Sequence, residues 1–433
     1  MSRNLANTNV WLVIALISAT GTPALAQSDC SVLGQNNFVR DVMVEFYLWY
    51  QEMPDVDPAL FDSPEAYLEA VKFRPLDETF SYIADQAATE VYYSSSQFIG
   101  IGFSMRQTGP EEIRVSQVFP DSPASEARLA RGDYLIAVDG RSIPELIQTG
   151  QLGAALGPSD EGYRVEIEWK TRRGEQRSAE VTKRPVTIPT VSQTEIIDVN
   201  GLPVGYLHFR NFVEPSVEAL DRAFAEFQAR GVTDVILDLR YNGGGLVSVA
   251  QHLGGLLGGV RTNTKTFVEF VHNDKNAFRN QAVSFYDPGA ALDLPRLVVI
   301  ATRASASASE MVVNALRPFI PVTIVGDTTF GKPVGQYGFD FCDKTLFPVA
   351  FKGVNSNGEG DYFGGIPADC PAGDDLNRPL GNSEEASLAE AVNFLRTGAC
   401  TTQSAALKAS RAQRQIEQRA IFMDGWRQMV NAW

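Results

Sequence analysis

A serine-rich segment, Ser305–Glu310, follows a buried apolar run and opens a stretch with helical spacing. A hydroxyl at such a strand-to-helix turn is lifted away from the sheet, and the unpaired N–H groups of the helix start can stabilise an oxyanion beside it. Ser307, in the middle of the segment, is therefore a candidate nucleophile, with Ala308 next to it. Serines before a helix also act as N-caps, and for this segment taken alone capping is the commoner role.

A lysine in a glycine-rich loop, Gly326–Gln336, offers a base for such a serine. If burial disfavours the charged form of a lysine and lowers its pKa, the amine can accept the proton of a serine hydroxyl. Serine/lysine pairs are an attested variant of the catalytic triad. Lys332 is the candidate for this role, although a lone lysine in a loop is more often a solvated surface charge.

Together the two segments resemble those of the C-terminal processing peptidases, also called tail-specific proteases, and the resemblance extends from Gln97 to about Cys400. It implies that Ser307 is the nucleophile, that Lys332 is its general base, and that Gln336 orients the lysine amine. The spacing between the serine and the lysine agrees with that of the family. The resemblance thus implies a serine endopeptidase, without a cofactor, that acts on proteins or peptides near their C-termini.

A second glycine-rich turn, Asp238–Gly245, matches the turn that supplies one backbone N–H of the oxyanion hole in that family. Glycine lets a substrate carbonyl approach without a side chain in the way. We predict Gly244 as this donor, with little to separate it from Gly245, and the N–H of Ala308 as the other donor. Gly243 stands where a proline is common in the family, which alters the stiffness of the turn more than its donors.

The region before the catalytic segments resembles a PDZ domain. Its short β-rich runs are punctuated by glycine, and Gly100, Ile101, Gly102 and Phe103 match the loop whose N–H groups receive a peptide's terminal carboxylate in that family. The strand that follows would pair with the peptide by β-augmentation. We expect this domain to capture substrate tails; the alternative is a PDZ fold that only regulates or braces the catalytic domain.

Other mechanisms and partners have less support. The three histidines, His208, His252 and His272, lie in no triad motif, and the sequence has neither a Gly-x-Ser-x-Gly elbow nor a His-Glu-x-x-His motif. No cysteine pair has zinc-ligand spacing, so we predict no metal site.

A net charge of -15 argues against nucleic acid and anionic lipid as main partners. A non-catalytic peptide-binding or scaffold protein on the same fold and an acyl transferase with the same dyad stay open.

The elements that position these residues follow from the hydrophobic pattern. Strands alternating with helices after Thr187 predict an α/β catalytic domain with a mainly parallel sheet. The resemblance to the C-terminal processing peptidases implies that the fold of this domain is ClpP/crotonase-like. Helical spacing in Phe38–Tyr50 and Tyr67–Val71 predicts a small N-terminal helical domain. The expected division is a signal peptide (1–26), an N-terminal helical domain (27–95), a PDZ domain (96–186), a peptidase domain (187–400) and a helical C-terminal tail (401–433).

The start of the chain has the pattern of a signal peptide. Arg3 precedes the apolar run Val10–Ile17, and Ala24 and Ala26 occupy the small-residue cleavage positions. The mature protein is therefore expected to be exported, to the periplasm or the medium, with no membrane-spanning segment and no lipid anchor. A homodimer is compatible with the sequence, which carries no distinctive heptad.

Four cysteines suit an oxidising compartment and permit three pairings. We expect Cys342 to pair with Cys370, closing a local loop, and Cys30 to pair with Cys400, tying the mature N-terminus to the end of the last domain. Free buried thiols are the alternative.

Overall fold

The computed structural model of the protein describes residues 29–401. The expected signal peptide (1–26) lies outside this range, as does all but the first residue of the expected helical tail (401–433). Within the described range, no helix has both the length and the apolar character needed to cross a membrane.

A six-stranded sheet forms the centre of the part that follows Thr190, in the order β10-β11-β12-β15-β16-β21. Its strands are β10 (Val191–Val199), β11 (Leu202–Phe209), β12 (Asp234–Asp238), β15 (Leu297–Ala301), β16 (Val322–Gly326) and β21 (Cys370–Pro371). β10 runs antiparallel to β11, and the other four pairings are parallel. The sheet is therefore mainly parallel, as the alternation of strands and helices predicts.

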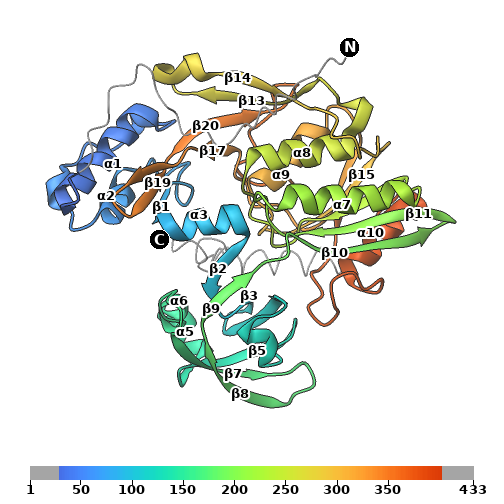
Figure 1. The fold of residues 1–433 in the computed structure, drawn as a ribbon, viewed down its shortest axis with the longest axis horizontal. Helices are drawn as coiled ribbons and strands as arrows, with labels where there is room; N and C mark the ends of the chain where they lie inside the picture. The colour runs from blue at the N-terminus through green and yellow to red at the C-terminus, as the bar shows by residue number, and fades with distance from the viewer. Residues whose placement is uncertain (1–28, 402–433) are drawn as a thin grey trace, which may run out of the picture.

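Apolar residues cover both faces of this sheet, because helices lie on each side (Figure 1). The helices are α7 (Ser216–Ala229), α8 (Val247–Gly258) and α9 (Ala308–Leu316) on one face and α10 (Ala386–Thr397) on the other. In β12, Val235 and Leu237 pack with the first group and Ile236 packs with α10. This alternation follows from the two-residue period of a strand.

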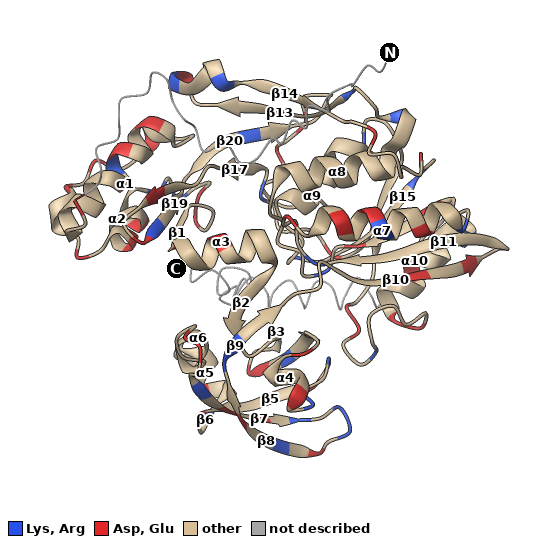
Figure 2. Cartoon of the chain, in the orientation of Figure 1, with Lys and Arg blue, Asp and Glu red and all other residues tan. Residues whose placement is uncertain are grey.

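Helix α7 shows how the sequence directs these helices onto the sheet. Leu220, Phe224 and Phe227 are fully buried in the core, whereas Glu218 and Glu226 are exposed. Figure 2 shows acidic and basic positions along α7. The helix therefore has one apolar stripe and one charged face, which is the pattern of a surface helix covering a core.

The N-terminal segment shares its core with strands from much later in the chain (Figure 1). It contains α1 (Val32–Phe46), η1 (Tyr50–Glu52), η2 (Pro58–Leu60), α2 (Pro64–Val71), β1 (Tyr82–Asp85) and α3 (Gln86–Ser95). Strand β1 pairs with β19 (Lys344–Phe347), so the segment is not purely helical as predicted. Short helices bury little apolar surface by themselves, and Phe38 and Met43 complete their burial against residues such as Phe341.

Two small sheets lie beside the central one. One sheet has the order β1-β19-β18, and the other has the order β14-β13-β20-β17. The added strands are β13 (Thr266–His272), β14 (Gln281–Ser284), β17 (Val334–Gln336), β18 (Phe339–Phe341) and β20 (Val349–Val354), with short helices η3 (Gly259–Arg261) and η4 (Asp274–Arg279) nearby in the chain. Lys332, the predicted base, thus lies two residues before β17, and Gln336 ends this strand.

A β-rich module, residues 103–182, lies to one side of the part built on the central sheet (Figure 1). It contains β3 (Phe103–Gly109), β4 (Glu112–Val118), α4 (Pro123–Glu126), β5 (Tyr134–Val138), β6 (Arg141–Ser142), α5 (Ile143–Gln148), α6 (Leu152–Ala155), β7 (Arg164–Lys170) and β8 (Gln176–Thr182). An antiparallel pair, β2 (Gln97–Gly100) and β9 (Arg184–Thr187), connects it to the rest. Its sheet has the order β3-β4-β5-β7-β8, so β3 is an edge strand.

The disulfide pairing differs from the predicted one. The bonds join Cys30 to Cys342 and Cys370 to Cys400. Packing of α1 against β18 brings the start of α1 to the turn that holds Cys342, while Cys370 lies in β21 beneath α10, whose end leads to Cys400. The prediction was wrong because it judged loop closure along the chain, whereas the sheet order decides which cysteines meet.

Candidate active site

Ser307 lies between β15 and α9, at the N-cap position of the helix. Its backbone has φ +55° and ψ -114°, outside the regions that non-glycine residues favour. The residue is half-buried, so its side chain reaches the surface of the site. A strained strand-to-helix turn of this kind presents a hydroxyl above the sheet.

The neighbouring serines have structural partners. Ser305 Oγ donates to the carbonyl of Leu239 at 2.8 Å, and Ser309 Oγ donates to the carbonyl of Asn242 at 2.9 Å. Both side chains are buried. Of the three serines, Ser307 is therefore the one whose position suits a nucleophile.

The loop that follows β16 brings Lys332 to the same site. Lys332 is 9% exposed, and its Nζ donates to Gln336 Oε1 at 2.6 Å. Gln336 Nε2 donates to the carbonyls of Phe80 at 2.6 Å and Phe347 at 3.0 Å. Because both amide hydrogens are directed at carbonyls, the oxygen of Gln336 must face the lysine.

A pocket of about 50 Å³ unites the predicted residues. Its lining consists of Ser307, Lys332, Gln336, Gly243, Gly244, Gly245, Tyr82, Tyr92 and Tyr93. The three tyrosines come from β1 and α3 of the N-terminal segment, and the sequence analysis missed them. No local motif marks them, because β1 reaches this pocket by pairing with β19, and α3 packs against both strands.

Gly244 lies directly against the serine turn. It has φ +98°, and a Cβ there would lie 2.8 Å from both the carbonyl oxygen of Ala306 and the nitrogen of Ala308. Its N–H donates to Asn242 Oδ1 at 3.0 Å, so this predicted oxyanion donor already has an internal partner. The carbonyl of Asn242 accepts the N–H of Ala306 at 3.1 Å, which fastens the glycine turn to the serine turn.

A buried charged junction connects the β-rich module with the glycine turn. Asp374 accepts hydrogen bonds from Arg106 at 2.5 Å, Arg131 at 2.7 Å and the hydroxyl of Tyr241 at 2.5 Å. Arg240 adds a contact at 3.3 Å. Burial alone would raise the pKa of Asp374, but the guanidinium groups of Arg131, Arg106 and Arg240 outweigh burial and hold this pKa well below its usual range.

The four residues predicted to receive a peptide carboxylate do not line the Ser307 pocket. Gly100 ends β2 and Phe103 begins β3, with Ile101 and Gly102 between them. The carbonyls of Ile101 and Gly102 accept the N–H groups of Ala124 and Phe119, both at 2.9 Å. The loop is therefore fixed through its carbonyls at the edge strand of the module.

The histidines have other surroundings. Burial lowers the pKa of His208 to about 4, with Arg240 and Arg210 acting in the same direction. His252 contacts Asp221 at 2.7 Å, and His272 contacts Tyr337 at 2.9 Å. None of the three lines the pocket that holds Ser307.

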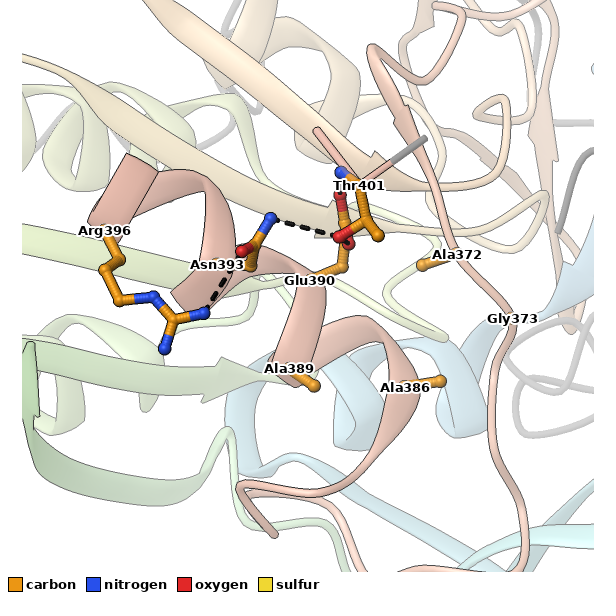
Figure 3. A pocket seen from close by; sticks show the side chains of 8 residues that line it. All are labelled: Ala372, Gly373, Ala386, Ala389, Glu390, Asn393, Arg396 and Thr401. Carbon is orange, nitrogen blue, oxygen red and sulfur yellow. Dashed lines mark hydrogen bonds between the residues drawn. The ribbon is translucent and has the colours of Figure 1, made fainter. Parts of the chain in front are cut away.

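One group of potential metal ligands lies within the described residues: Cys370, Glu390 and Cys400. The two cysteines are joined in a disulfide, so they offer no thiolate. Beside them α10 borders a hollow of about 330 Å³ (Figure 3). Its polar side chains bond to one another, as in the contact of Asn393 with Thr401 at 3.1 Å.

The residues of this site lie within a segment that matches a known protein family. The model of Peptidase family S41 matches residues 203–371, which include the glycine turn, Ser307, Lys332 and Gln336. The model of the Peptidase S41 N-terminal domain matches residues 34–82. Residues 34–82 and 203–371 of the chain are therefore similar to these two domains of family S41.

The chain is also similar to individual C-terminal processing proteases. The chloroplastic C-terminal processing peptidase of Tetradesmus obliquus is 27% identical over 255 residues, covering 56% of this chain and 53% of the relative. Carboxy-terminal processing protease CtpA of Bacillus subtilis is 26% identical over 294 residues, covering 67% of this chain and 60% of the relative. The chain thus spans between half and two thirds of the length of these relatives.

Solved structures share the fold. A Bacteroides fragilis protein named as an S41 protease has a TM-score of 0.66 and 27% identity, covering 83% of this chain and 96% of that chain. The photosystem II D1 C-terminal processing protease has a TM-score of 0.51 and 22% identity, covering 79% of this chain and 93% of that chain. The second likeness concerns the fold alone.

Proposed function

We propose that this chain is a serine endopeptidase that cleaves proteins or peptides near their C-termini, with Ser307 as nucleophile and Lys332 as general base. The observation that carries the proposal is the shared pocket, in which Gln336 holds the lysine amine beside the turn that presents the serine. We assign the catalytic sheet to the ClpP/crotonase-like class and the β-rich module to the PDZ class.

The reaction proceeds through an acyl-enzyme. Ser307 Oγ attacks the scissile carbonyl carbon while its proton passes to Lys332 Nζ. The tetrahedral intermediate then collapses, the C–N bond breaks, and Lys332 gives the proton to the leaving amine. Water attacks the acyl carbon after losing a proton to Lys332, and that proton returns to Ser307 as the acid product leaves.

Backbone N–H groups stabilise the oxyanion formed in these steps. The N–H of Ala308 belongs to the first turn of α9, where N–H groups have no partner within the helix. The glycine turn supplies the second donor. Gly244 can serve only if its N–H leaves Asn242 Oδ1, so Gly245 keeps its place as the alternative.

The β-rich module captures the substrate tail. Its edge strand β3 offers a row of backbone groups for β-augmentation, and Gly100, Ile101, Gly102 and Phe103 precede or begin that strand. The terminal carboxylate would bind the N–H groups of this loop. The chain then needs no cofactor, and its partners are proteins or peptides that present a free C-terminus.

The setting of this activity is outside the cytoplasm, in the periplasm or the medium. Two disulfides agree with an oxidising compartment, and the N-terminal pattern agrees with export. A homodimer is compatible with this proposal but is not required by the site.

The test is cleavage of an unfolded reporter with an apolar C-terminal tail at matched concentrations of folded enzyme. We expect Ser307→Ala and Lys332→Ala to abolish cleavage, because each removes a group that the acylation step requires. Ser305→Ala and Ser309→Ala are the matched controls, since their hydroxyls donate to buried carbonyls, and both should stay active.

The same reporter with an amidated C-terminus tests the role of the tail. Amidation removes the charge that the loop would bind, so cleavage should weaken through KM. If wild type binds the tail without cleaving the reporter, the chain is a peptide-binding scaffold and the endopeptidase proposal is wrong.

A further inference from the structure

A buried carboxylate, Glu310, lies beneath the proposed dyad. It belongs to the first turn of α9, three residues after Ser307, and its side chain is inaccessible to solvent. A carboxyl group that is fully buried costs free energy unless its oxygens are hydrogen-bonded. The partners of Glu310 therefore indicate its role.

The two oxygens of Glu310 divide their hydrogen bonds between both halves of the site. Oε2 accepts the backbone N–H of Ser307 at 2.9 Å and that of Lys332 at 2.8 Å. Oε1 accepts the backbone N–H of Gly331 at 2.6 Å and lies 2.5 Å from Thr329 Oγ1. One oxygen atom thus joins the backbone of the nucleophile to the backbone of the base.

Three of these four groups are backbone N–H groups, which can only donate. A planar carboxylate can receive them on both oxygens at once, which neither an amide nor a hydroxyl can do. Burial raises the pKa of Glu310, and the hydrogen bonds from Thr329, Lys332, Gly331 and Ser307 act in the opposite direction.

We propose that Glu310 is a positioning residue that sets the spacing between Ser307 and Lys332 by binding both backbones with one carboxylate. This inference rests on the proposed serine/lysine function. Glu310 itself lies outside the lining of the Ser307 pocket and acts through the two residues that line it. A displacement of about 1 Å at a reacting group can cost about 100-fold in rate, so small shifts at this carboxylate matter.

A carboxylate that only capped α9 would act differently. It would contribute to the stability of the helix start and leave kcat unchanged once the protein is folded. The two roles therefore predict different effects on kcat and on the reactivity of Ser307 toward a small probe.

The experiment compares Glu310→Gln with Glu390→Gln in the full chain. Glu390 is also buried and accepts two hydrogen bonds from Thr401, at 2.7 Å and 2.6 Å, but it lies on α10 outside the Ser307 pocket. Readouts are kcat and KM for the tailed reporter, the rate at which a fluorophosphonate labels Ser307, and the folded fraction by circular dichroism.

We expect folded Glu310→Gln to keep KM within about two-fold and to lose about 100-fold in both kcat and labelling rate, as a misplaced dyad would. Glu390→Gln should keep wild-type kcat. A folded Glu310→Gln with wild-type kcat, or with a raised KM alone, overturns the positioning role while the proposed function stands.

Two further outcomes are decisive. If Glu310→Gln does not fold, Glu310→Asp replaces it in the experiment, because aspartate keeps the charge but shortens the side chain by one methylene. A folded Glu310→Asp with wild-type kcat overturns the positioning role. A loss in kcat with unchanged KM supports it. If wild type neither cleaves nor reacts with the probe, the proposed function fails first, and the positioning role falls with it.

Discussion

The side-chain oxygen of Gln336 lies 2.6 Å from Nζ of Lys332. The amide that carries this oxygen is itself held by two carbonyls, those of Phe80 and Phe347. One hydrogen of the lysine amine is therefore directed at a fixed acceptor. When the amine is neutral, its lone pair must point away from Gln336, and the proposed base gains a defined orientation.

Replacing Gln336 with an apolar residue tests this orientation. We expect Gln336→Leu to lower kcat by about 100-fold, the lower end of what general base catalysis contributes, while KM changes little. Steady-state kinetics on the tailed reporter measures both values. An unchanged kcat would show that the lysine needs no orienting group.

The Gln336→Glu variant separates orientation from charge. A carboxylate at this position keeps an acceptor for the amine and favours the charged form of the amine, because opposite charges attract at short range. It cannot donate to the carbonyls of Phe80 and Phe347, so both variants lose this anchor and differ in the acceptor and its charge. The acid limb of the pH profile of kcat/KM should therefore move to higher pH. Activity at high pH should recover further than that of Gln336→Leu.

Gly244→Ala tests the close approach of the glycine turn. A Cβ at Gly244 would lie 2.8 Å from two backbone atoms of the serine turn, so the variant must shift one turn against the other. We expect kcat to fall by about 100-fold, as for the loss of an oxyanion donor. The matched control is Gly289→Ala, since Gly289 also has a positive φ, +87°, but faces open space.

The Gly289→Ala control measures how much stability and activity are lost through a positive φ alone. Gly289→Ala should lose a small amount of stability from the strained backbone, and Gly244→Ala should lose more because it adds the backbone clash; chemical denaturation measures both. A Gly244→Ala variant as active as Gly289→Ala would place the oxyanion hole away from this turn.

Local pattern predicted the elements that carry the chemistry. The strand over 234–239, the strand over 297–302 and the helix over 309–316 all occur within one residue of the predicted bounds. Each has a buried apolar run or a helical stripe, and such patterns are encoded within a few residues. Ser307 and Lys332 became candidates through the resemblance of their two segments to those of the C-terminal processing peptidases, because each segment taken alone favours a structural role.

Features that depend on strand order were not predictable in this way. The cysteine pairing was wrong because β21 joins the edge of the central sheet and α10 returns across it. The pocket tyrosines were missed because Tyr82 reaches the site only through the pairing of β1 with β19. Asp374 was missed for the same reason, since its arginine partners lie far from it in the chain.

Asp374→Asn tests the junction between the module and the glycine turn. The substitution removes the negative charge between Arg106, Arg131 and Arg240 and leaves buried guanidinium groups without it. We expect the free energy of unfolding to fall by about 3 kcal/mol, the lower end for a broken buried ion pair. Activity should fall as well, because the hydroxyl of Tyr241, at the start of the glycine turn, loses its charged acceptor.

Asp375→Asn is the neighbouring control. Its carboxylate is partly exposed and pairs with Arg378 at 3.3 Å, so its loss should cost less than about 1 kcal/mol. Chemical denaturation and reporter cleavage measure both variants. Equal stabilities for the two would mean that the junction contributes no more than a surface pair.

His208 should make the folded protein sensitive to mild acid. Burial lowers its pKa from 6.5 to about 4, so between these values the unfolded chain binds a proton that the folded chain does not. Stability therefore increases with pH across this window and is lost as the pH falls through it. Between about pH 7 and pH 5 this single group should account for about 2 kcal/mol of the free energy of unfolding.

His208→Gln removes the titrating group while keeping a polar side chain at this position in β11. Its stability at neutral pH can differ from that of wild type in either direction, so the quantity to compare is the change between the two pH values. We expect wild type to lose about 2 kcal/mol more than His208→Gln on that change, measured by urea denaturation at each pH. Asp238, Arg240 and Arg210 face the same site, and because both proteins contain them, their titration cancels in the comparison. Equal losses in the two proteins would show that the imidazole gains a proton without unfolding and that its burial does not control acid stability.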